Sequence, residues 1–320
     1  MIKTNLILID GIPGSGKSTT AQLLCLNLRK QGYQARWIYE QEMPHPIYDP
    51  EELAQAMEIG FPKAHAIHDR ALSNWKNLVL SLKETREIVI MDGLLFQTTL
   101  GSLLLGGEDR KKSIDYILSI QNVIHDLNPV FIYLYQKDIA KALRWICNRR
   151  GQAFEALLIH KIANTFYGRK HGIYDFTDVV EFFQDVKEII DFLFSALRMP
   201  KISIETDSTG NRQRYYKEIS TFLSITDLQE TVPPRNPLTA FVGLYKALEA
   251  DEELAIATDG KHLFIDNLFQ TRLIHKKENT FYVEGTHSTL SFETDKGNFI
   301  KKMVYQVDRS YSNVWTRISL

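Results

Sequence analysis

Residues 11–18 of this 320-residue chain read Gly-Ile-Pro-Gly-Ser-Gly-Lys-Ser and match the pattern GxxxxGK[ST] at every fixed position. The octet follows an apolar run at 6–9 and opens a segment, 17–30, whose apolar residues recur at helical spacing. A glycine-rich turn between a strand and a helix presents backbone N–H groups to phosphate oxygens. The sequence therefore predicts a nucleoside triphosphate site that also takes Mg²⁺.

Particular side chains of this loop have predicted roles. Lys17 is expected to neutralise the β- and γ-phosphate oxygens, and Ser18 to supply its hydroxyl to Mg²⁺. The predicted nucleotide-binding residues are Gly11, Ile12, Pro13, Gly14, Ser15, Gly16, Lys17, Ser18 and Thr19.

Short β-type runs alternate with longer helical patterns through the first two-thirds of the chain. Three of the runs, 6–9, 88–91 and 130–135, are apolar at consecutive positions, as expected for central strands covered by helices on both faces. The pattern predicts an α/β domain with a parallel sheet. The predicted strands are 6–9, 35–39, 88–91, 130–135 and 202–205, and the predicted helices include 17–30, 64–83, 114–127, 139–150 and 182–197.

The alternation stops near residue 223, and residues 227–237 include three prolines within five positions, which indicates a linker. Further on, strand-like runs are separated by turn residues, and Asp259-Gly260 predicts a two-residue hairpin. The runs are 254–258, 262–266, 272–275, 280–284, 289–293 and 299–305. We therefore predict an α/β domain at 1–225, a proline-rich linker at 226–237 and a small antiparallel β domain at 238–320.

The formal net charge is −1, so no overall basic field would hold the chain on extended nucleic acid or on an anionic membrane. The N-terminal apolar stretch is broken at Asp10 and is too short for a signal peptide or a membrane span. The two cysteines are far apart and lie in apolar helical patterns, which favours packing over a disulfide. We expect a cytoplasmic protein, and association into a homo-oligomer stays open.

The residue that ends the third strand run separates classes of P-loop protein. Asp92 stands at the carboxyl end of a central strand, where it would hold Mg²⁺ through water or contact the substrate. No acidic residue follows it, which disfavours ATPases that activate water with a glutamate. The chain also has no Asn-Lys-x-Asp segment to read guanine. A small kinase is the leading class.

Two further groups of charged residues are candidates for the transfer step. Glu40 and Glu42 follow the second strand run, where one carboxylate would accept a proton from an acceptor hydroxyl or hold a sugar, and Glu40 is favoured by its position against the strand. A solvated acidic loop is the alternative. At least one of Arg144, Arg149 and Arg150 is expected to stabilise the transferring phosphoryl group, or else they complement the helix dipole. The predicted catalytic residues are Lys17, Asp92, Arg144, Arg149 and Glu40, and the predicted metal ligands are Ser18 and Asp92.

These features together resemble the thymidylate kinase and deoxynucleoside kinase branch of P-loop kinases, over roughly residues 1–225. The resemblance implies a five-stranded parallel sheet with a mobile lid, and phosphoryl transfer from ATP. Thymidylate kinases usually have Asp-Arg after the third strand and deoxynucleoside kinases Glu-Arg-Ser, whereas this chain has Asp92-Gly93-Leu94. Because the arginine expected to meet a substrate phosphate is absent there, a neutral hydroxyl acceptor becomes more plausible than a nucleoside monophosphate. The C-terminal domain is weakly similar to small β domains appended to β-lactamase-like hydrolases.

The sequence thus predicts ATP- and Mg²⁺-dependent phosphoryl transfer to a small hydroxyl-bearing or nucleotide-like acceptor. The alternative is a nucleotide-binding switch with slow hydrolysis, whose β domain engages a protein partner.

Overall fold

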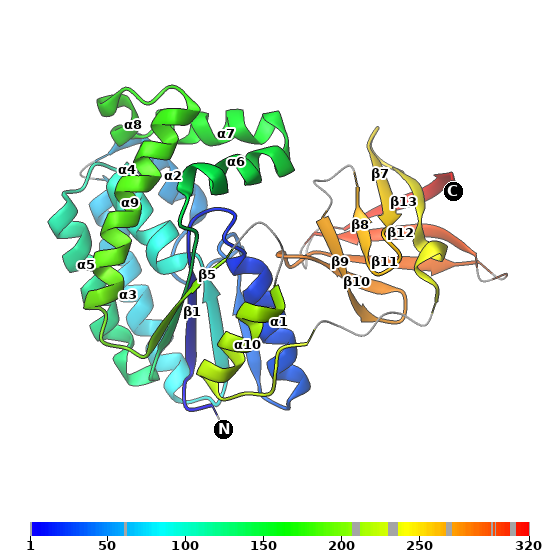
Figure 1. The fold of residues 1–320 in the computed structure, drawn as a ribbon, viewed down its shortest axis with the longest axis horizontal. Coiled ribbons are helices and arrows are strands. Elements are labelled where there is room, and N and C mark those ends of the chain that lie inside the picture. The colour runs from blue at the N-terminus through cyan, green and yellow to red at the C-terminus, as the bar shows by residue number, and fades with distance from the viewer. Residues whose placement is uncertain are drawn as a thin grey trace. The chain divides into compact units, whose positions relative to one another are not determined.

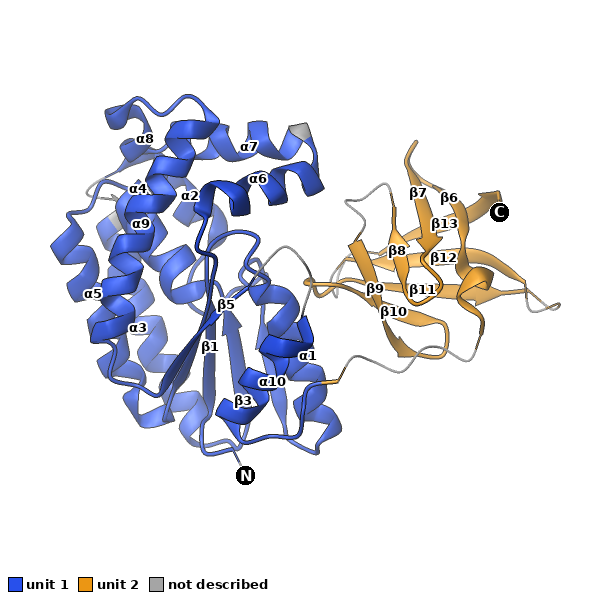
Figure 2. Ribbon diagram, viewed as in Figure 1, with its two compact units in different colours: residues 1–228 blue, residues 229–320 orange. Residues whose placement is uncertain are grey.

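The structure, a computed structural model, describes residues 2–60, 63–206, 212–229, 236–266, 271–295, 297, 299–307 and 312–319, without the side chains of residues 63, 64 and 152. The chain divides into two compact units, Met1–Leu228 and Gln229–Leu320 (Figure 2). Half of the predicted linker, residues 230–235, and the polar residues 207–210 after the predicted strand 202–205 lie outside the described residues. Of the helices that are described, none has both the length and the apolar character needed to cross a membrane.

The first unit is built on a parallel sheet of five strands in the order β2-β3-β1-β4-β5 (Figure 1). The three runs predicted as central strands are central, and the predicted five-stranded α/β fold is confirmed. The strands are β1 Leu6–Asp10, β2 Ala35–Ile38, β3 Ile88–Asp92, β4 Val130–Tyr135 and β5 Lys201–Glu205.

Helices cover both faces of this sheet, which explains why the central strands are apolar throughout. Leu6 and Leu8 of β1 pack in one buried cluster, while Ile7 and Ile9 pack in a second cluster on the opposite face. The first cluster includes α3 Lys63–Lys83, α5 Arg110–Ile124 and α9 Phe176–Ala196, and the second includes α1 Lys17–Lys30 and α10 Arg212–Leu223.

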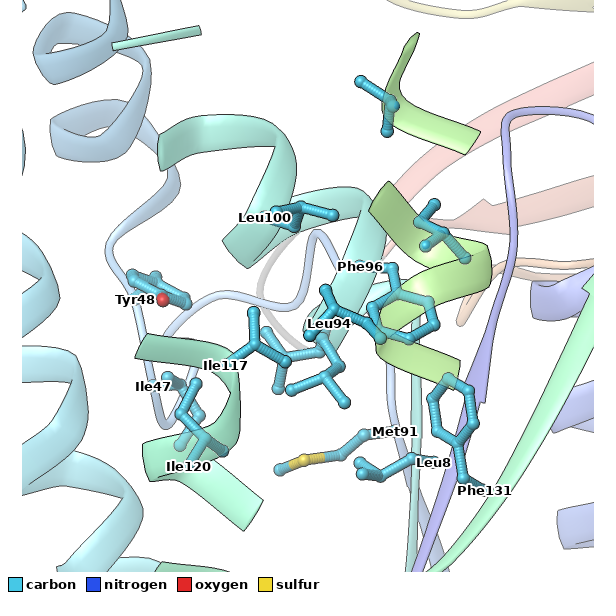
Figure 3. Close-up of a cluster of buried hydrophobic side chains, with 14 of the residues drawn as sticks. Leu8, Ile47, Tyr48, Met91, Leu94, Phe96, Leu100, Ile117, Ile120 and Phe131 are labelled. Carbon is cyan, nitrogen blue, oxygen red and sulfur yellow. The ribbon is translucent and has the colours of Figure 1, made fainter. Parts of the chain in front are cut away.

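Figure 3 shows part of the first cluster, where side chains from β1, β3 and β4 meet those that follow β3. Phe96 is fully buried, and its ring centroid lies 4.9 Å from that of Phe131 in an edge-to-face arrangement. The segment that follows β3 is therefore anchored in the core beneath the sheet's carboxyl edge.

Several helices in the first unit were not predicted from the sequence. A π-helix, η1 Leu94–Leu100, follows β3 directly and continues into α4 Gly101–Leu105. The others are α2 Pro50–Ile59, α7 Gln152–Ala163 and α8 Phe166–His171. Residues of η1, α4, α2 and α7 line the space beside residues 11–13.

The predicted ends of helix α6, Ile139–Arg150, are confirmed. The Asp138 carboxylate accepts a hydrogen bond from the Lys141 N–H at 2.9 Å, and Gly151 follows the helix with a φ of 84°. Asp138 satisfies one N–H group that the helix leaves unpaired, and glycine tolerates the left-handed turn into α7.

The second unit is a closed antiparallel barrel in the strand order β10-β11-β12-β13-β6-β7-β8-β9. The antiparallel β prediction is confirmed, although β6 and β13 were not predicted as strands. These two strands pair with each other and close the barrel. The strands are β6 Gly243–Ala247, β7 Glu253–Thr258, β8 Leu263–Ile265, β9 Thr271–Lys277, β10 Thr280–Val283, β11 Thr289–Thr294, β12 Ile300–Gln306 and β13 Ser312–Ser319.

The hairpin predicted at Asp259-Gly260 forms between β7 and β8, but the two-residue loop was wrong. Thr258 pairs with Leu263, so the loop has four residues. The Asp259 carboxylate accepts hydrogen bonds from the N–H groups of Lys261 and His262 at 2.8 and 2.6 Å, which stabilises the longer turn.

Phe241 should be a main source of stability for the barrel. Its side chain is fully buried, with ring centroids 5.0 Å from Phe281 and 5.1 Å from Phe292. We expect Phe241→Ala to lower the free energy of unfolding by about 3–5 kcal/mol, because it leaves a cavity among aromatic rings. The control, Phe299→Ala, removes a ring that is 72% exposed and should change stability by less than about 0.5 kcal/mol. Urea unfolding measures both, and equal effects would contradict the prediction.

Candidate functional site

The predicted phosphate-binding loop connects β1 to α1, as its sequence context indicated. Gly14 and Gly16 have φ values of 83° and 86°, in the left-handed region that favours glycine. A Cβ at Gly11 would lie 2.2 Å from the carbonyl oxygen of Leu134 on the neighbouring strand β4. The loop conformation therefore depends on its glycines, both for backbone freedom and for close approach.

The loop leaves positive groups without an internal anion. Gly16 provides no side-chain cap for α1, and the first turn of α1 contains no acidic residue. Lys17 is only 6% exposed, yet no carboxylate of the described residues lies within ion-pairing distance of it. Ser15 is also buried, and its Oγ has no hydrogen-bond partner among the residues that the structure describes. Unpaired N–H groups and an unpaired buried ammonium fit an anionic ligand such as a phosphate chain.

Asp92 ends β3 beneath this loop and is fully buried. Its Oδ2 accepts a hydrogen bond from Ser18 Oγ at 2.5 Å, and its Oδ1 accepts one from Trp37 Nε1 at 2.6 Å. Burial raises the pKa of Asp92 to about 7, with a further increase from the Glu40 carboxylate. The bonds from Ser18 and Trp37 and the charge of Lys17 act in the opposite direction. The two predicted metal ligands, Ser18 and Asp92, are thus in direct contact.

Glu40 follows β2 and lies against the backbone of Gly93. A Cβ at Gly93 would be 2.5 Å from Glu40 Oε2 and 2.9 Å from Lys17 Cε. Glu40 Oε2 accepts a hydrogen bond from Gln97 Nε2 at 2.6 Å. Because residue 93 is glycine, the Glu40 carboxylate and the Lys17 stem occupy the space that a side chain there would need.

Glu42 has a different environment. Its carboxylate accepts a hydrogen bond from the Tyr39 N–H at 3.3 Å, while its own N–H donates to the Tyr39 carbonyl at 2.9 Å. Glu42 therefore contributes to the turn that follows β2, whereas Glu40 faces Lys17 and Gln97. Of the two candidates left open by the sequence, the geometry favours Glu40.

Asp10 was not predicted as a site residue. It ends β1, is 1% exposed, and accepts backbone hydrogen bonds from Gly11, Phe96 and Gln97 at 2.8, 2.7 and 3.1 Å. Burial raises its pKa to about 6, against the lowering effect of these bonds and of Lys17. Asp10 joins the start of the phosphate-binding loop to η1. A charged residue at the end of an apolar strand, next to the loop, was the available signal.

The predicted arginines lie on α6, which packs on the loop: a Cβ at Gly14 would be 3.2 Å from the Ile146 Cβ. Arg144 forms an ion pair with Glu155 at 2.7 Å, and its guanidinium carbon lies 3.7 Å from the Phe176 ring centroid. It is thus engaged with α7 and α9.

The other two arginines lie at the end of α6. Arg149 and Arg150 lie over the rings of Trp145 and Phe154, at 5.3 and 4.8 Å from the ring centroids. The pKa of Tyr39 is raised mainly by burial and further by the charges of Glu40 and Asp92, whereas the charge of Arg150 lowers it. The charge of Arg150 therefore acts on Tyr39, the residue before Glu40, although the sequence did not favour Arg150 over Arg149.

A cavity of about 280 Å³ adjoins the loop. Its lining combines Gly11, Ile12 and Pro13 of the loop with Gln97 of η1 and side chains from α2, α7 and α9. Gln97 thus lies between Glu40 and this cavity. The sequence did not single out Gln97, because a glutamine inside an apolar segment has no distinctive pattern.

A pH experiment tests the burial of Asp10. Its pKa rises from 3.8 to about 6 on folding, so the folded state binds more protons than the unfolded state between these values. The stabilising contribution of this group is therefore present below about pH 4 and is lost as the pH rises through 6. We expect the difference in unfolding free energy between wild type and Asp10→Asn to shift against wild type by about 2 kcal/mol from pH 4 to pH 7.

Urea unfolding of both proteins at several pH values measures this shift. Other titrating groups are common to both proteins and largely cancel. A difference that is constant with pH, or that changes in favour of wild type as pH rises, would contradict the assignment.

A family model described as Novel STAND NTPase 3 (nSTAND3) matches residues 1–149, which include the phosphate-binding loop and Asp92. Among curated proteins, none matches the chain.

The solved structures that match include P-loop kinases of low identity. Thymidylate kinase from Candida albicans is 16% identical, with 69% of this chain and 92% of that chain covered and a TM-score of 0.43. Deoxyadenosine kinase from M. mycoides with bound dATP is 15% identical, with 67% and 99% covered and a TM-score of 0.39. Shikimate kinase from Acinetobacter baumannii in complex with shikimate is 13% identical, with 69% and 94% covered and a TM-score of 0.37.

The predicted resemblance to thymidylate and deoxynucleoside kinases thus has counterparts among the solved structures. The family match and the geometry of residues 11–18 together support nucleotide binding by the first unit, which has the fold of a P-loop NTPase.

Proposed function

We propose that the first unit is a kinase that transfers the γ-phosphoryl group of ATP, with Mg²⁺, to a hydroxyl of a small acceptor. The observation that carries the proposal is the grouping of Lys17, Asp92 and Glu40 at one edge of the sheet, where Gly93 allows the Glu40 carboxylate to approach the stem of Lys17. A triphosphate-binding lysine beside a carboxylate that is not its ion-pair partner suits transfer to a hydroxyl.

The residues present fit a magnesium nucleotide. In the described part of the chain, no group of three or more His, Cys, Asp or Glu side chains could hold a metal by itself. Ser18 and Asp92 would therefore hold Mg²⁺ together with phosphate oxygens and water, as is usual for this ion. The ion would supply positive charge to the phosphate oxygens.

In the proposed reaction, the acceptor hydroxyl gives its proton to Glu40 while its oxygen bonds to the γ-phosphorus. The bond from that phosphorus to the β–γ bridging oxygen breaks, and ADP leaves. Lys17 would stabilise the charge on the transferring group, and Arg150 is the arginine of α6 best placed to assist, because its charge already acts on Tyr39 beside Glu40. Arg144 would have to leave its ion pair with Glu155 to take that role.

A second candidate is a nucleotide-hydrolysing switch. The family model that matches residues 1–149 is described as an NTPase family, which favours this alternative. The two candidates differ in one measurable respect: a switch releases phosphate from ATP without any acceptor, whereas the kinase requires the acceptor for turnover.

Nucleotide binding can be tested at Lys17. We expect Lys17→Ala to weaken Mg²⁺-ATP binding at least about tenfold, because the variant loses the buried ammonium that is proposed to meet the outer phosphates. Isothermal titration calorimetry measures the affinity. Lys76→Ala, on the exposed surface of α3, is the control and should bind like wild type. Equal Mg²⁺-ATP affinity of the two variants would contradict the assignment of Lys17 to the nucleotide site.

The role of Glu40 can be tested against its neighbour Glu42. We expect Glu40→Gln to slow phosphoryl transfer by roughly 10²–10⁴-fold, because the amide cannot accept the hydroxyl proton. Glu42→Gln should lose less than about tenfold, since Glu42 bonds to the Tyr39 backbone. Transfer from labelled ATP to a panel of nucleosides, nucleotides and other alcohols measures the rates. A larger loss in Glu42→Gln than in Glu40→Gln would reverse the assignment.

A further inference from the structure

The cavity beside the phosphate-binding loop has polar groups gathered at one end. Gly11 follows β1 and Gln97 follows β3, two strands that are paired in parallel register. Their segments are also joined through Asp10, whose carboxylate accepts the N–H groups of both residues. Thr98 lines the cavity next to Gln97. A reactive group bound at this end would lie next to the site of the γ-phosphate.

Gln97 has an unused acceptor at this end. Its Nε2 donates to Glu40, whereas its Oε1 is buried and has no hydrogen-bond partner among the described residues. A buried carbonyl oxygen without a donor is costly, and a ligand hydroxyl would satisfy it. The same hydroxyl would then be separated from the Glu40 carboxylate only by the Gln97 amide, which bonds to both groups.

The rest of the lining is apolar, and its hydroxyl groups are already engaged. Ser102 Oγ donates to the Thr99 carbonyl at 3.0 Å, and Thr165 Oγ1 donates to the Ile162 carbonyl at 2.7 Å. Among the described lining residues, Lys161 alone carries a charge, and it is exposed. The apolar wall includes Leu53, Phe96, Leu158, Phe182 and Val186.

These features define the chemistry of a ligand. A polar or charged body would lose its hydration against this wall without gaining partners, whereas an apolar body would be stabilised by burial. The volume of about 280 Å³ lies near the lower end of the roughly 300–1,000 Å³ found for small-molecule pockets, which indicates a small ligand.

We propose that this cavity holds the phosphoryl acceptor, and that the acceptor is a neutral, largely apolar alcohol whose hydroxyl lies at the loop end beside Gln97. This inference rests on the proposed kinase function. It narrows the hydroxyl-bearing acceptor to one class and excludes nucleoside monophosphates, whose phosphate would find no basic side chain in the described lining apart from the exposed Lys161.

The test compares alcohols that differ in their apolar body. The full-length protein with Mg²⁺ and labelled ATP is given 2-phenylethanol, glycerol or thymidine monophosphate, and kcat/KM is measured for each. We expect kcat/KM for 2-phenylethanol to exceed that of the other two at least tenfold. Preferred transfer to thymidine monophosphate or to glycerol would overturn the proposal and leave the kinase function standing.

Two variants locate the binding site. Leu158→Asp places a charge in the cavity wall, and its matched control, Leu157→Asp, places the same charge on a neighbouring side chain of α7 that is 46% exposed. Binding of 2-phenylethanol, followed by ligand-observed NMR, should weaken at least tenfold in Leu158→Asp but not in Leu157→Asp. Equal binding by the two variants would overturn the proposal.

A second variant tests the same cavity in case Leu158→Asp fails to fold. Gly101 lines the cavity in a right-handed helical conformation, and a Cβ there would meet nothing closer than the Phe96 carbonyl oxygen at 3.9 Å. Gly101→Leu should therefore fold, fill the cavity and reduce 2-phenylethanol binding at least tenfold, with retained Mg²⁺-ATP affinity as the check on folding. Undiminished alcohol binding in this variant would overturn the proposal. A different result would be that wild type binds 2-phenylethanol but transfers no phosphoryl group to it, while Gly101→Leu does not bind it. That result would support the ligand class and overturn the kinase function.

Discussion

The Asp10 carboxylate organises the candidate site. It is buried at the end of β1, and the three backbone N–H groups that it accepts belong to Gly11, Phe96 and Gln97. A carboxylate removed from water must be compensated by hydrogen bonds, so the start of the phosphate-binding loop and the start of η1 have to lie beside each other. The core contacts of Phe96 hold the same segment from below (Figure 3). The position of Gln97, and through it that of Glu40, follows from this arrangement.

The second constraint is the small size of residue 93. Gly93 has a φ of 67°, and any side chain there would collide with Glu40 and the Lys17 stem. An arginine at position 93 would leave no room for the Glu40 carboxylate. The close approach of Glu40 therefore depends on the absence of a side chain at this position. Glycine at position 93 supplies no cation for an acceptor phosphate, and Glu40 is the proton acceptor in the proposed reaction. Both consequences favour a neutral alcohol as the proposed acceptor.

Much of the fold was predictable because its signals are local. Consecutive apolar residues in β1, β3 and β4 predicted central strands, and Asp138 and Gly151 predicted the ends of α6. The closure of the barrel was not predictable, because β6 and β13 pair across about 70 intervening residues and neither has a strong strand pattern alone. The π-helix after β3 was also missed. Its residues are apolar on several sides, and packing against the sheet, rather than periodicity, decides their conformation.

The sequence by itself determined the phosphate-binding loop, since its glycines, Lys17 and Ser18 act through backbone conformation and neighbouring atoms within eight residues. It also identified Asp92 and Glu40 as candidates, because both end strands whose carboxyl ends meet at one edge. Only the tertiary structure decided which groups touch: Ser18 with Asp92, Glu40 with Gln97, and Asp10 with η1. These contacts join segments more than 50 residues apart, and the packing of the whole sheet sets their distances.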